Sequence, residues 1–362
     1  MKTIDVQLKN NEYKIIVGKN ILSQAGNFVN PLGIGRDAVI ITNPVVAKYY
    51  GKSIISGLRK CQLTACLLTV PDGEKSKSAK FAIQLLEKIA RYDVGKKIFI
   101  LALGGGVIGD LSGFVAAVYK RGIPYLQVPT TLLAQIDSAI GGKVAIDLSV
   151  GKNLVGAFYQ PKMVISDIAA LSTLNVRQIR NGLAEAVKYG IICDAKFFDY
   201  IESHIDKIFE LDPEVLTEIV LVCSKIKANI VMRDEKETKG MRTILNFGHT
   251  VGHAIEAAGS YSNYHHGEAI ALGMRVAADI SYRLGFLDKE SVRRINSLLS
   301  RLGLPQRIKK IAFHQIFKFM AHDKKFRAGK NRFILATKIG SVKVVEGVPP
   351  NIIKTAIRAY FN

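Results

Sequence analysis

The chain has 362 residues, a length at which one hydrophobic core usually gives way to two domains of about 150 to 200 residues each. Its 51 lysines and arginines outnumber its 30 aspartates and glutamates, and the net charge of +21 should attract anions, either phosphorylated metabolites or nucleic acid. Four cysteines without paired spacing exclude a disulfide-rich scaffold. No run approaches the ~18 apolar residues of a membrane span and no signal peptide is recognisable, so we expect a soluble, cytoplasmic protein.

The first half of the chain alternates short β-branched runs with segments of helical period. The strand-like runs cover residues 3–8, 13–17, 37–42, 63–70, 97–103 and 124–128, and the clearest helical segments cover residues 78–92 and 107–119. Such alternation is typical of a mostly parallel sheet with helices on its faces, whose ligands bind beyond the carboxyl ends of the strands.

From about residue 176 onward, segments of helical period replace the strands. They cover residues 214–232, 267–284 and 289–302. The sequence therefore predicts an α/β protein with two domains. Residues 1–175 form a Rossmann-like domain with a mostly parallel sheet, and residues 176–362 form a mainly α-helical domain.

A glycine-rich turn follows a strongly apolar run. Residues 97–103 lead directly into the sequence GGGVIGD at residues 104–110, which opens an apolar helical segment. Glycines at a helix start let a pyrophosphate approach backbone N–H groups, although a tight strand-to-helix turn alone would also explain them. Polar segments follow other strands in the same way, at residues 42–43, 71–77 and 129–131. This recurrence favours a nucleotide-binding edge of the sheet.

Two lysines beside glycines are candidates for binding an anion. Lys143 follows two glycines, and Lys152 lies between Gly151 and Asn153. Flexible backbone next to an ammonium group is the pattern expected where phosphate or carboxylate oxygens are bound. Solvated loop lysines are the alternative for each of them.

Histidines and a carboxylate form a candidate metal centre. Four of the seven histidines fall between His249 and His266, and His249 and His253 share one helical face because they are four residues apart. Glu185 lies in an otherwise apolar helical face, one turn before Lys188, and a buried charge needs a partner. A catalytic divalent site needs about three nitrogen or oxygen ligands, which Glu185, His249 and His266 could supply. A single histidine, by contrast, is more often an ordinary core or surface residue.

Taken together, these segments resemble the 3-dehydroquinate synthase family over nearly the whole chain. The stretches that carry the resemblance are residues 72–77, 104–110, 119–122, 129–131, 137–143, 151–153, 185–188, 245–256, 266–268 and 322–325. The resemblance implies a phosphate-eliminating lyase of the shikimate pathway, and so of aromatic amino acid biosynthesis. Its substrate would be 3-deoxy-D-arabino-heptulosonate 7-phosphate and its product 3-dehydroquinate. The resemblance also implies catalytic use of NAD, a zinc or cobalt ion and a homodimer.

The family's functional positions carry over to this chain residue by residue. The implied metal ligands are Glu185, His249 and His266. The implied NAD-binding residues are Asn43, Asp72, Gly73, Glu74, Lys75, Ser76, Lys77, Gly105, Gly106, Val107, Ile108, Gly109, Asp110, Thr130, Thr131, Asp137, Lys143, Lys152, Leu171, Ser172, Thr173 and Leu174. The implied catalytic or substrate-contacting residues are Arg121, Lys143, Asn153, Lys188, Lys227, Arg242, Asn246, His253 and Lys324.

The implied reaction explains why these residue types occur together. It comprises a transient oxidation of the substrate, loss of phosphate, reduction and ring closure, so that NAD is regenerated in each turnover. His253 is implied to relay a proton. Arg121, Lys143, Lys152 and Asn153 are implied to hold the substrate's carboxylate and phosphate.

The sequence departs from the family pattern at two places. One extra residue lies near Lys239, between residues 234–237 and Arg242, and this spacing bears on the assignment of Lys227 more than on that of Arg242. Asn175 stands where the family commonly has proline, which affects the backbone expected at residues 171–175.

Other functions remain open on the sequence alone. Another sugar-phosphate cyclase or a metal-dependent alcohol dehydrogenase would share the architecture, but Lys152 and Arg242 favour a carboxylated substrate. Nucleic-acid binding is suggested by the net charge and by the basic stretch at residues 301–332. That stretch lacks the interleaved aromatic residues of known modules, so we expect no specific nucleic-acid partner and no membrane partner.

Overall fold

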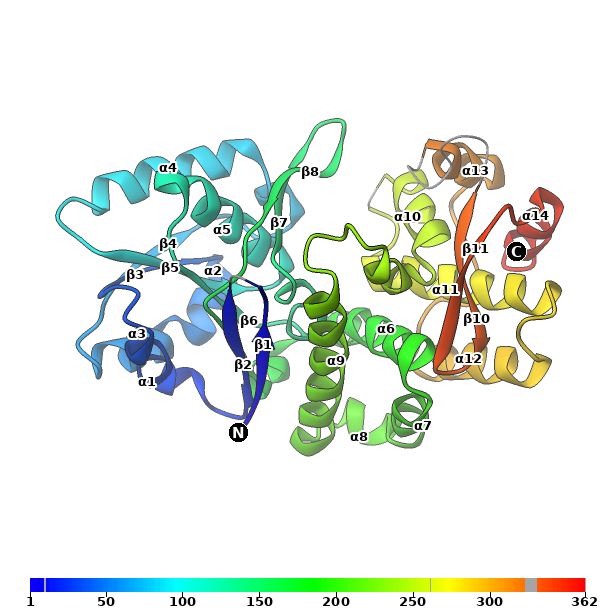
Figure 1. Ribbon diagram of the computed structural model, residues 1–362, viewed down its shortest axis with the longest axis horizontal. Helices are drawn as coiled ribbons and strands as arrows, with labels where there is room; N and C mark the ends of the chain where they lie inside the picture. The colour runs from blue at the N-terminus through cyan, green and yellow to red at the C-terminus, as the bar shows by residue number, and fades with distance from the viewer. Residues whose placement is uncertain (10, 261, 323–330, 362) are drawn as a thin grey trace. The chain divides into compact units, whose positions relative to one another are not determined.

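The structure is a computed structural model that describes residues 1–9, 11–260, 262–322 and 331–361 (Figure 1). Packing divides the chain into two compact units. The first comprises Met1–Leu174 and Pro213–Lys236, and the second comprises Asn175–Asp212 and Glu237–Asn362. Among the described residues, every helix is too short or too polar to cross a lipid bilayer.

The first unit is built on a seven-stranded sheet in the order β1-β2-β9-β6-β5-β3-β4. Its strands are β1 (Lys2–Gln7), β2 (Glu12–Gly18), β3 (Asp37–Thr42), β4 (Thr64–Thr69), β5 (Ile98–Gly104), β6 (Tyr125–Pro129) and β9 (Met163–Asp167). Strand β1 pairs antiparallel with β2, and the other neighbours pair in parallel. The predicted mostly parallel sheet is therefore confirmed, although β9 was not predicted.

Helices cover both faces of this sheet. The helices of the first unit are α1 (Ala25–Val29), α2 (Pro44–Val46), α3 (Lys52–Arg59), α4 (Ala79–Tyr92), α5 (Gly106–Val118) and α9 (Pro213–Arg233). Alternate residues of β3 point to opposite faces, as the two-residue period of a strand requires. Ala38 and Ile40 belong to the core cluster that includes α1 and α3, whereas Val39 and Ile41 belong to the cluster that includes α4 and α5.

Helix α9 packs in the first unit, although its residues fall in the sequence range expected for the second domain. The helix itself was predicted, at residues 214–232, and it contacts β1 and β2. Helical period identifies a buried face, but it does not say which core that face joins. The first crossing between the units follows Leu174, next to the expected boundary after residue 175.

A separate antiparallel hairpin, β7 (Lys143–Leu148) and β8 (Gly151–Phe158), carries the two candidate lysines that follow glycines. Most residues of β8 are exposed. Without a buried face the strand has no regular apolar alternation, which explains why the hairpin was not predicted.

The second unit is mainly α-helical, as expected, and contains one small sheet. Its helices are α6 (Val176–Cys193), α7 (Ala195–Ser203), α8 (Ile205–Phe209), α10 (His249–Ala258), α11 (His266–Arg283), α12 (Lys289–Arg301), α13 (Phe313–His322) and α14 (Pro350–Arg358). An antiparallel hairpin that was not predicted, β10 (Arg332–Lys338) and β11 (Ser341–Glu346), packs against α11 through β10.

Candidate functional site

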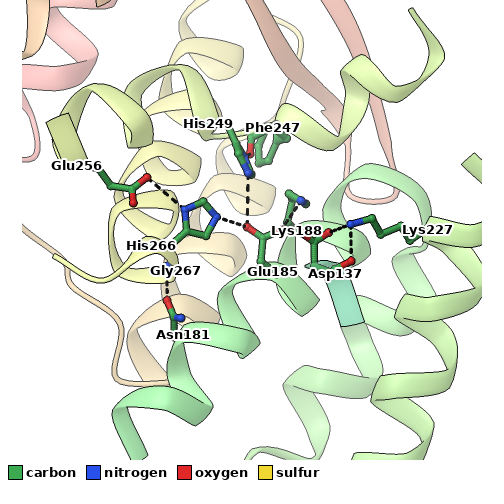
Figure 2. A network of polar contacts seen from close by, with 10 residues as sticks. All are labelled: Asp137, Asn181, Glu185, Lys188, Lys227, Phe247, His249, Glu256, His266 and Gly267. Carbon is green, nitrogen blue, oxygen red and sulfur yellow. Dashed lines mark hydrogen bonds and ion pairs between the residues drawn. The ribbon is translucent and has the colours of Figure 1, made fainter. Parts of the chain in front are cut away.

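Three helices of the second unit bring Glu185, His249 and His266 together (Figure 2). Glu185 lies in the middle of α6, and the two histidines are the first residues of α10 and α11. Glu185 Oε1 is 3.7 Å from His249 Nε2 and 3.6 Å from His266 Nε2. One ligand atom from each residue lies within 4.8 Å of the others, which is the geometry of a three-ligand metal centre.

Glycines allow the helices to approach closely enough for this arrangement. A Cβ on Gly273 of α11 would lie 1.9 Å from the carbonyl oxygen of Gly248, which precedes α10. A Cβ on Gly267 would lie 2.2 Å from the carbonyl oxygen of Asn181 in α6. Any side chain at these two positions would force the helices apart. The absence of a side chain beside His249 and His266 therefore lets the three candidate ligands lie close together.

Both imidazoles turn Nε2 toward Glu185 because an acceptor faces the other ring nitrogen. His249 Nδ1 is 3.1 Å from the carbonyl oxygen of Phe247, which can only accept, so we assign the ring proton to Nδ1. His266 Nδ1 is 3.2 Å from Glu256 Oε2, and the same assignment follows from the charge of that carboxylate. In both rings Nε2 then offers a lone pair, and a carboxylate or carbonyl behind a histidine is the usual support for a metal ligand.

Glu256 was not among the predicted site residues, although the sequence contains a signal for it. Glu256 is three residues from His253 and seven from His249 in the same helix, so the three side chains share one helical face. Glu256 is buried, and with His253 and His266 it forms a second group of potential ligands. We assign Glu256 to the support of His266, because its oxygen faces Nδ1 rather than the shared centre.

Charges around Glu185 balance a buried carboxylate. The side chain is fully buried and forms an ion pair with Lys188, one helical turn away. Burial raises the pKa of Glu185, but Lys188, His249 and His266 together lower that pKa well below its usual value. Burial and Lys188 lower the pKa of His249. Burial also lowers the pKa of His266, but the nearby carboxylates of Glu185 and Glu256 outweigh burial and raise that pKa to about 10, and a metal ion would compete with the proton for Nε2.

The residues present fit a divalent cation. Glu185 Oε1 is buried and makes no hydrogen bond within the described part of the chain, which would be costly for an ionised oxygen in a dry site. Two imidazole nitrogens face the same oxygen at distances too long for hydrogen bonds. One oxygen and two nitrogens suit zinc or cobalt.

Many of the expected nucleotide-binding residues lie at the carboxyl edge of the parallel sheet in the first unit, whereas Lys143 and Lys152 lie on the separate β7–β8 hairpin. Gly104, which ends β5, is opposite Pro129, which ends β6, and Thr130 donates its N–H to the carbonyl oxygen of Gly104. Thr42 at the end of β3 is opposite Thr69 at the end of β4. The three expected polar segments and the glycine-rich turn therefore share one edge, as predicted for strands that run in parallel.

The glycine-rich turn opens the 13-residue helix α5 with little room for side chains. A Cβ on Gly105 would lie 3.1 Å from Thr131 Cγ2, and one on Gly106 would lie 3.0 Å from Ser138 Oγ. Glycine at these positions has no side chain to cover the backbone N–H groups of the first turn. A dinucleotide phosphate can therefore approach these groups closely. Gly109 has a packing role, because a Cβ there would lie 2.7 Å from Gln127 Oε1.

Several of the polar site residues predicted in the first unit contact one another or a neighbouring side chain. Asn43 Nδ2 donates to Asp72 Oδ1 at 2.7 Å, and Lys152 Nζ lies 3.5 Å from Glu74 Oε1. Lys77 forms a 2.6 Å ion pair with Asp110 and also donates to the side chain of Asn153. Lys227 Nζ donates to the carbonyl oxygen and to Oδ1 of Asp137, at 2.6 and 2.7 Å (Figure 2). Thr173 is 2.6 Å from the hydroxyl of Tyr50.

The remaining predicted residues are divided between the units. Arg121 and Lys143 are exposed in the first unit, whereas Lys188 and Arg242 are buried in the second. The same unit contains Asn246, at the end of a short 3-10 helix, and the exposed His253. Lys324 lies outside the described residues.

Neither departure from the family pattern disturbs a regular helix or strand. Lys239 falls in the irregular connection between α9 and the 3-10 helix Met241–Asn246. Asn175 is the N-cap of α6, and its φ of −71° is one that proline also adopts. Its side chain accepts the N–H of Gln178 at 2.9 Å, a bond that proline could not make.

Comparison with known proteins identifies the family. The model for the N-terminal part of 3-dehydroquinate synthase matches residues 67–181, and the model for the C-terminal part matches residues 182–326. A 3-dehydroquinate synthase from Desulforamulus reducens is 42% identical over 349 residues, which span 96% of this chain and 97% of that protein. One from Aliivibrio fischeri is 42% identical over 358 residues, which span 99% of each chain.

A solved structure agrees with this result. The crystal structure of 2-deoxy-scyllo-inosose synthase, complexed with carbaglucose-6-phosphate, NAD+ and Co2+, matches with a TM-score of 0.89 and 27% identity. The match covers 99% of this chain and 100% of that one. The glycine-rich edge, the carboxylate–histidine centre and the full-length identity lead to one conclusion: the chain belongs to the 3-dehydroquinate synthase family.

Proposed function

We propose that this protein converts 3-deoxy-D-arabino-heptulosonate 7-phosphate to 3-dehydroquinate and phosphate, with NAD used catalytically and a divalent metal ion. It is then a lyase of the shikimate pathway. The observation that carries the proposal is the buried oxygen of Glu185, which makes no hydrogen bond among the described residues while two imidazole nitrogens face it. Membership of the family supplies the substrate class.

Glu185, His249 and His266 hold the zinc or cobalt ion in this proposal. When bound, such an ion lowers the pKa of a coordinated hydroxyl group, so that the group ionises near neutral pH. Lys188 offsets the charge of Glu185, and Glu256 fixes the ring of His266. His253 is exposed, and its ring centroid is 5.1 Å from that of His249, so it is placed to move a proton between the centre and solvent.

The nucleotide-binding residues are those at the carboxyl edge of the sheet and the helix start that follows it. NAD bound by these residues would supply a reversible hydride acceptor. The N–H groups of Gly106 and Val107 bind the pyrophosphate. The ion pair of Lys77 with Asp110 holds the helix start against residues 71–77. The other residues of this group are Asn43, Asp72, Gly73, Glu74, Lys75, Ser76, Gly105, Ile108, Gly109, Thr130, Thr131, Asp137, Lys143, Lys152, Leu171, Ser172, Thr173 and Leu174.

Basic and amide side chains bind the anionic substrate. We assign this role to Arg121, Lys143, Lys152, Asn153, Lys188, Lys227, Arg242, Asn246 and Lys324. Removal of one preorganised charged contact should cost about 2 to 4 kcal/mol of transition-state stabilisation. Lys227 is already oriented by two bonds to Asp137, so little rotamer entropy remains to be lost when substrate binds.

The assignment of domains and partners is part of the same proposal. Residues 1–175 bind NAD, and residues 176–362 bind metal and substrate. The enzyme acts in the cytoplasm as a homodimer. Sedimentation velocity at micromolar concentration should give the mass of two chains, and a single-chain mass would remove the dimer from the proposal.

Phosphate release is the decisive experiment. Purified protein with NAD and zinc or cobalt should release phosphate from the heptulosonate phosphate without accumulating NADH, and EDTA should abolish the release. Accumulation of NADH would instead indicate a dehydrogenase. Release from glucose 6-phosphate or sedoheptulose 7-phosphate, with none from the heptulosonate phosphate, would assign the protein to another sugar-phosphate cyclase.

A further inference from the structure

A buried carboxylate in the first unit contacts the turn that carries Arg121. Asp93 ends α4, and its side chain is 4% exposed. Its Oδ2 accepts the hydroxyl of Tyr119 at 2.9 Å and forms an ion pair with the ammonium group of Lys120. The two residues that precede Arg121 are thus both attached to one carboxylate.

The backbone of this turn needs such attachment. Lys120, Arg121 and Gly122 are consecutive residues with positive φ, at 48°, 65° and 123°. Left-handed backbone is unfavourable for residues with a Cβ, and it persists only where surrounding contacts enforce it. Asp93 supplies these contacts before Arg121, and the N–H of Gly122 closes the turn on the carbonyl oxygen of Tyr119 at 2.8 Å.

Asp93 is itself held in place by backbone hydrogen bonds at the end of α4. The N–H of Asp93 bonds to the carbonyl oxygen of Ile89 at 2.9 Å, and its own carbonyl oxygen accepts the N–H of Lys96 at 3.2 Å. Beyond the turn, Tyr159 donates its hydroxyl to the carbonyl oxygen of Ile123 at 2.8 Å. The exposed Arg121 is therefore presented from a turn that is held on both sides.

We propose that Asp93 is a positioning residue for Arg121. By holding Tyr119 and Lys120, its carboxylate maintains the left-handed turn that presents the guanidinium to an anionic group of the substrate. This inference rests on the proposed function, because Arg121 is there a substrate-binding residue. Asp93 acts only through the turn and does not touch substrate itself.

The test is a double-mutant cycle on Asp93 and Arg121 in the full-length enzyme with NAD and metal. Asp93→Asn retains an acceptor for Tyr119 but cannot pair with Lys120, and it should raise KM for the heptulosonate phosphate on the order of tenfold with little change in kcat. In an Arg121→Ala background the same change should alter KM by less than about twofold. Tyr119→Phe keeps the carboxylate and should raise KM by less than Asp93→Asn does.

Controls separate positioning from loss of structure. Glu290→Gln removes an exposed carboxylate that pairs with Arg293 on α12, and it should leave both kinetic constants unchanged. Each variant must also show the wild-type unfolding midpoint or a measured correction for its folded fraction. If Asp93→Asn does not fold, Tyr119→Phe takes its place in the double-mutant cycle with Arg121→Ala.

Three results would overturn the inference. The first is an unchanged KM in both Asp93→Asn and Tyr119→Phe. The second is an equal effect in the wild-type and Arg121→Ala backgrounds, which would mean that Asp93 acts on the fold in general. The third is a wild-type enzyme that releases no phosphate from the heptulosonate phosphate, which would refute the proposed function as well.

Discussion

Oε1 of Glu185 and Nε2 of His266 face each other at 3.6 Å, and the oxygen is buried without a hydrogen bond among the described residues. A cation between them would satisfy both atoms. We predict that His249→Ala and His266→Ala lose bound metal, and that Glu256→Gln weakens binding by about 10- to 100-fold, as loss of a supporting carboxylate does at other metal sites. Chelator competition followed by metal analysis measures the metal affinity of each variant. Full metal content in His249→Ala after dialysis would contradict the ligand assignment.

Gly267 lies against the backbone of Asn181, with 2.2 Å between the position of a Cβ and the carbonyl oxygen. We predict that Gly267→Ala separates α11 from α6, lowers the free energy of unfolding by about 1 to 3 kcal/mol and weakens metal binding. Gly51→Ala is the matched control, because its Cβ would meet Leu67 at an ordinary 3.4 Å. Urea unfolding of both variants makes the comparison, and equal midpoints would refute the packing argument.

Asp167 organises the start of the first unit from the end of β9. The buried carboxylate accepts four backbone N–H groups, those of Asn20, Ile21, Leu22 and Ala169, at 2.8 to 3.1 Å. In Asp167→Asn the amide nitrogen would face donors in place of one oxygen. We predict a loss of about 2 to 4 kcal/mol in the free energy of unfolding, measured with urea. A loss below about 1 kcal/mol would mean that water replaces these bonds.

Asn175 caps the helix that carries Glu185. Its side chain accepts the N–H of Gln178, and the Gln178 side chain returns toward the N–H of Asn175 to complete a capping box. Asn175→Ala should cost about 1 kcal/mol in the free energy of unfolding, whereas Asn175→Asp should be nearly neutral. Thermal and urea unfolding test the pair. An Ala variant as stable as the wild type would show that the cap contributes nothing.

The phenol of Tyr119 should make stability depend on alkaline pH. Burial, and next the hydrogen bond to Asp93, raise the pKa of Tyr119 to about 12. A raised pKa in the folded state stabilises the protein below the ordinary tyrosine pKa of about 10, and this contribution is lost as the pH rises through about 12. The variant Tyr119→Phe lacks this pH-dependent contribution to stability. The difference in urea midpoint between wild type and variant should shrink from pH 9 to pH 11.5, and a constant difference would contradict the assignment.

Local patterns were sufficient to predict much of the fold. The alternation of strand and helix periods gave the parallel sheet, and the glycine run gave the start of α5 within one residue. Glu185 was found because a charge in an apolar helical face is expensive unless it is paired. Strand β9 and the hairpins β7–β8 and β10–β11 were missed, because short strands without clean alternation resemble loops. Helix α9 was predicted, but not the unit in which it packs.

The supporting residues lay beyond such patterns. Glu256 could have been predicted from its helical spacing to His249. The sequence around Asp93 and Asp167, however, does not indicate the distant groups that their carboxylates bind. Asp93 holds a turn 26 residues away, and Asp167 binds N–H groups near the start of the chain, almost 150 positions earlier. Such contacts depend on which segments the folded core brings together.

The sequence by itself determined the residue types: glycines after an apolar strand, a carboxylate in an apolar helix, and histidines at a helical spacing. Each follows from interactions within one turn or one strand, so a short window contains the whole signal. Only the tertiary structure decided that Glu185, His249 and His266 face one point. That meeting depends on contacts such as Gly273 against Gly248 and Gly267 against Asn181, where packing between segments sets the distance.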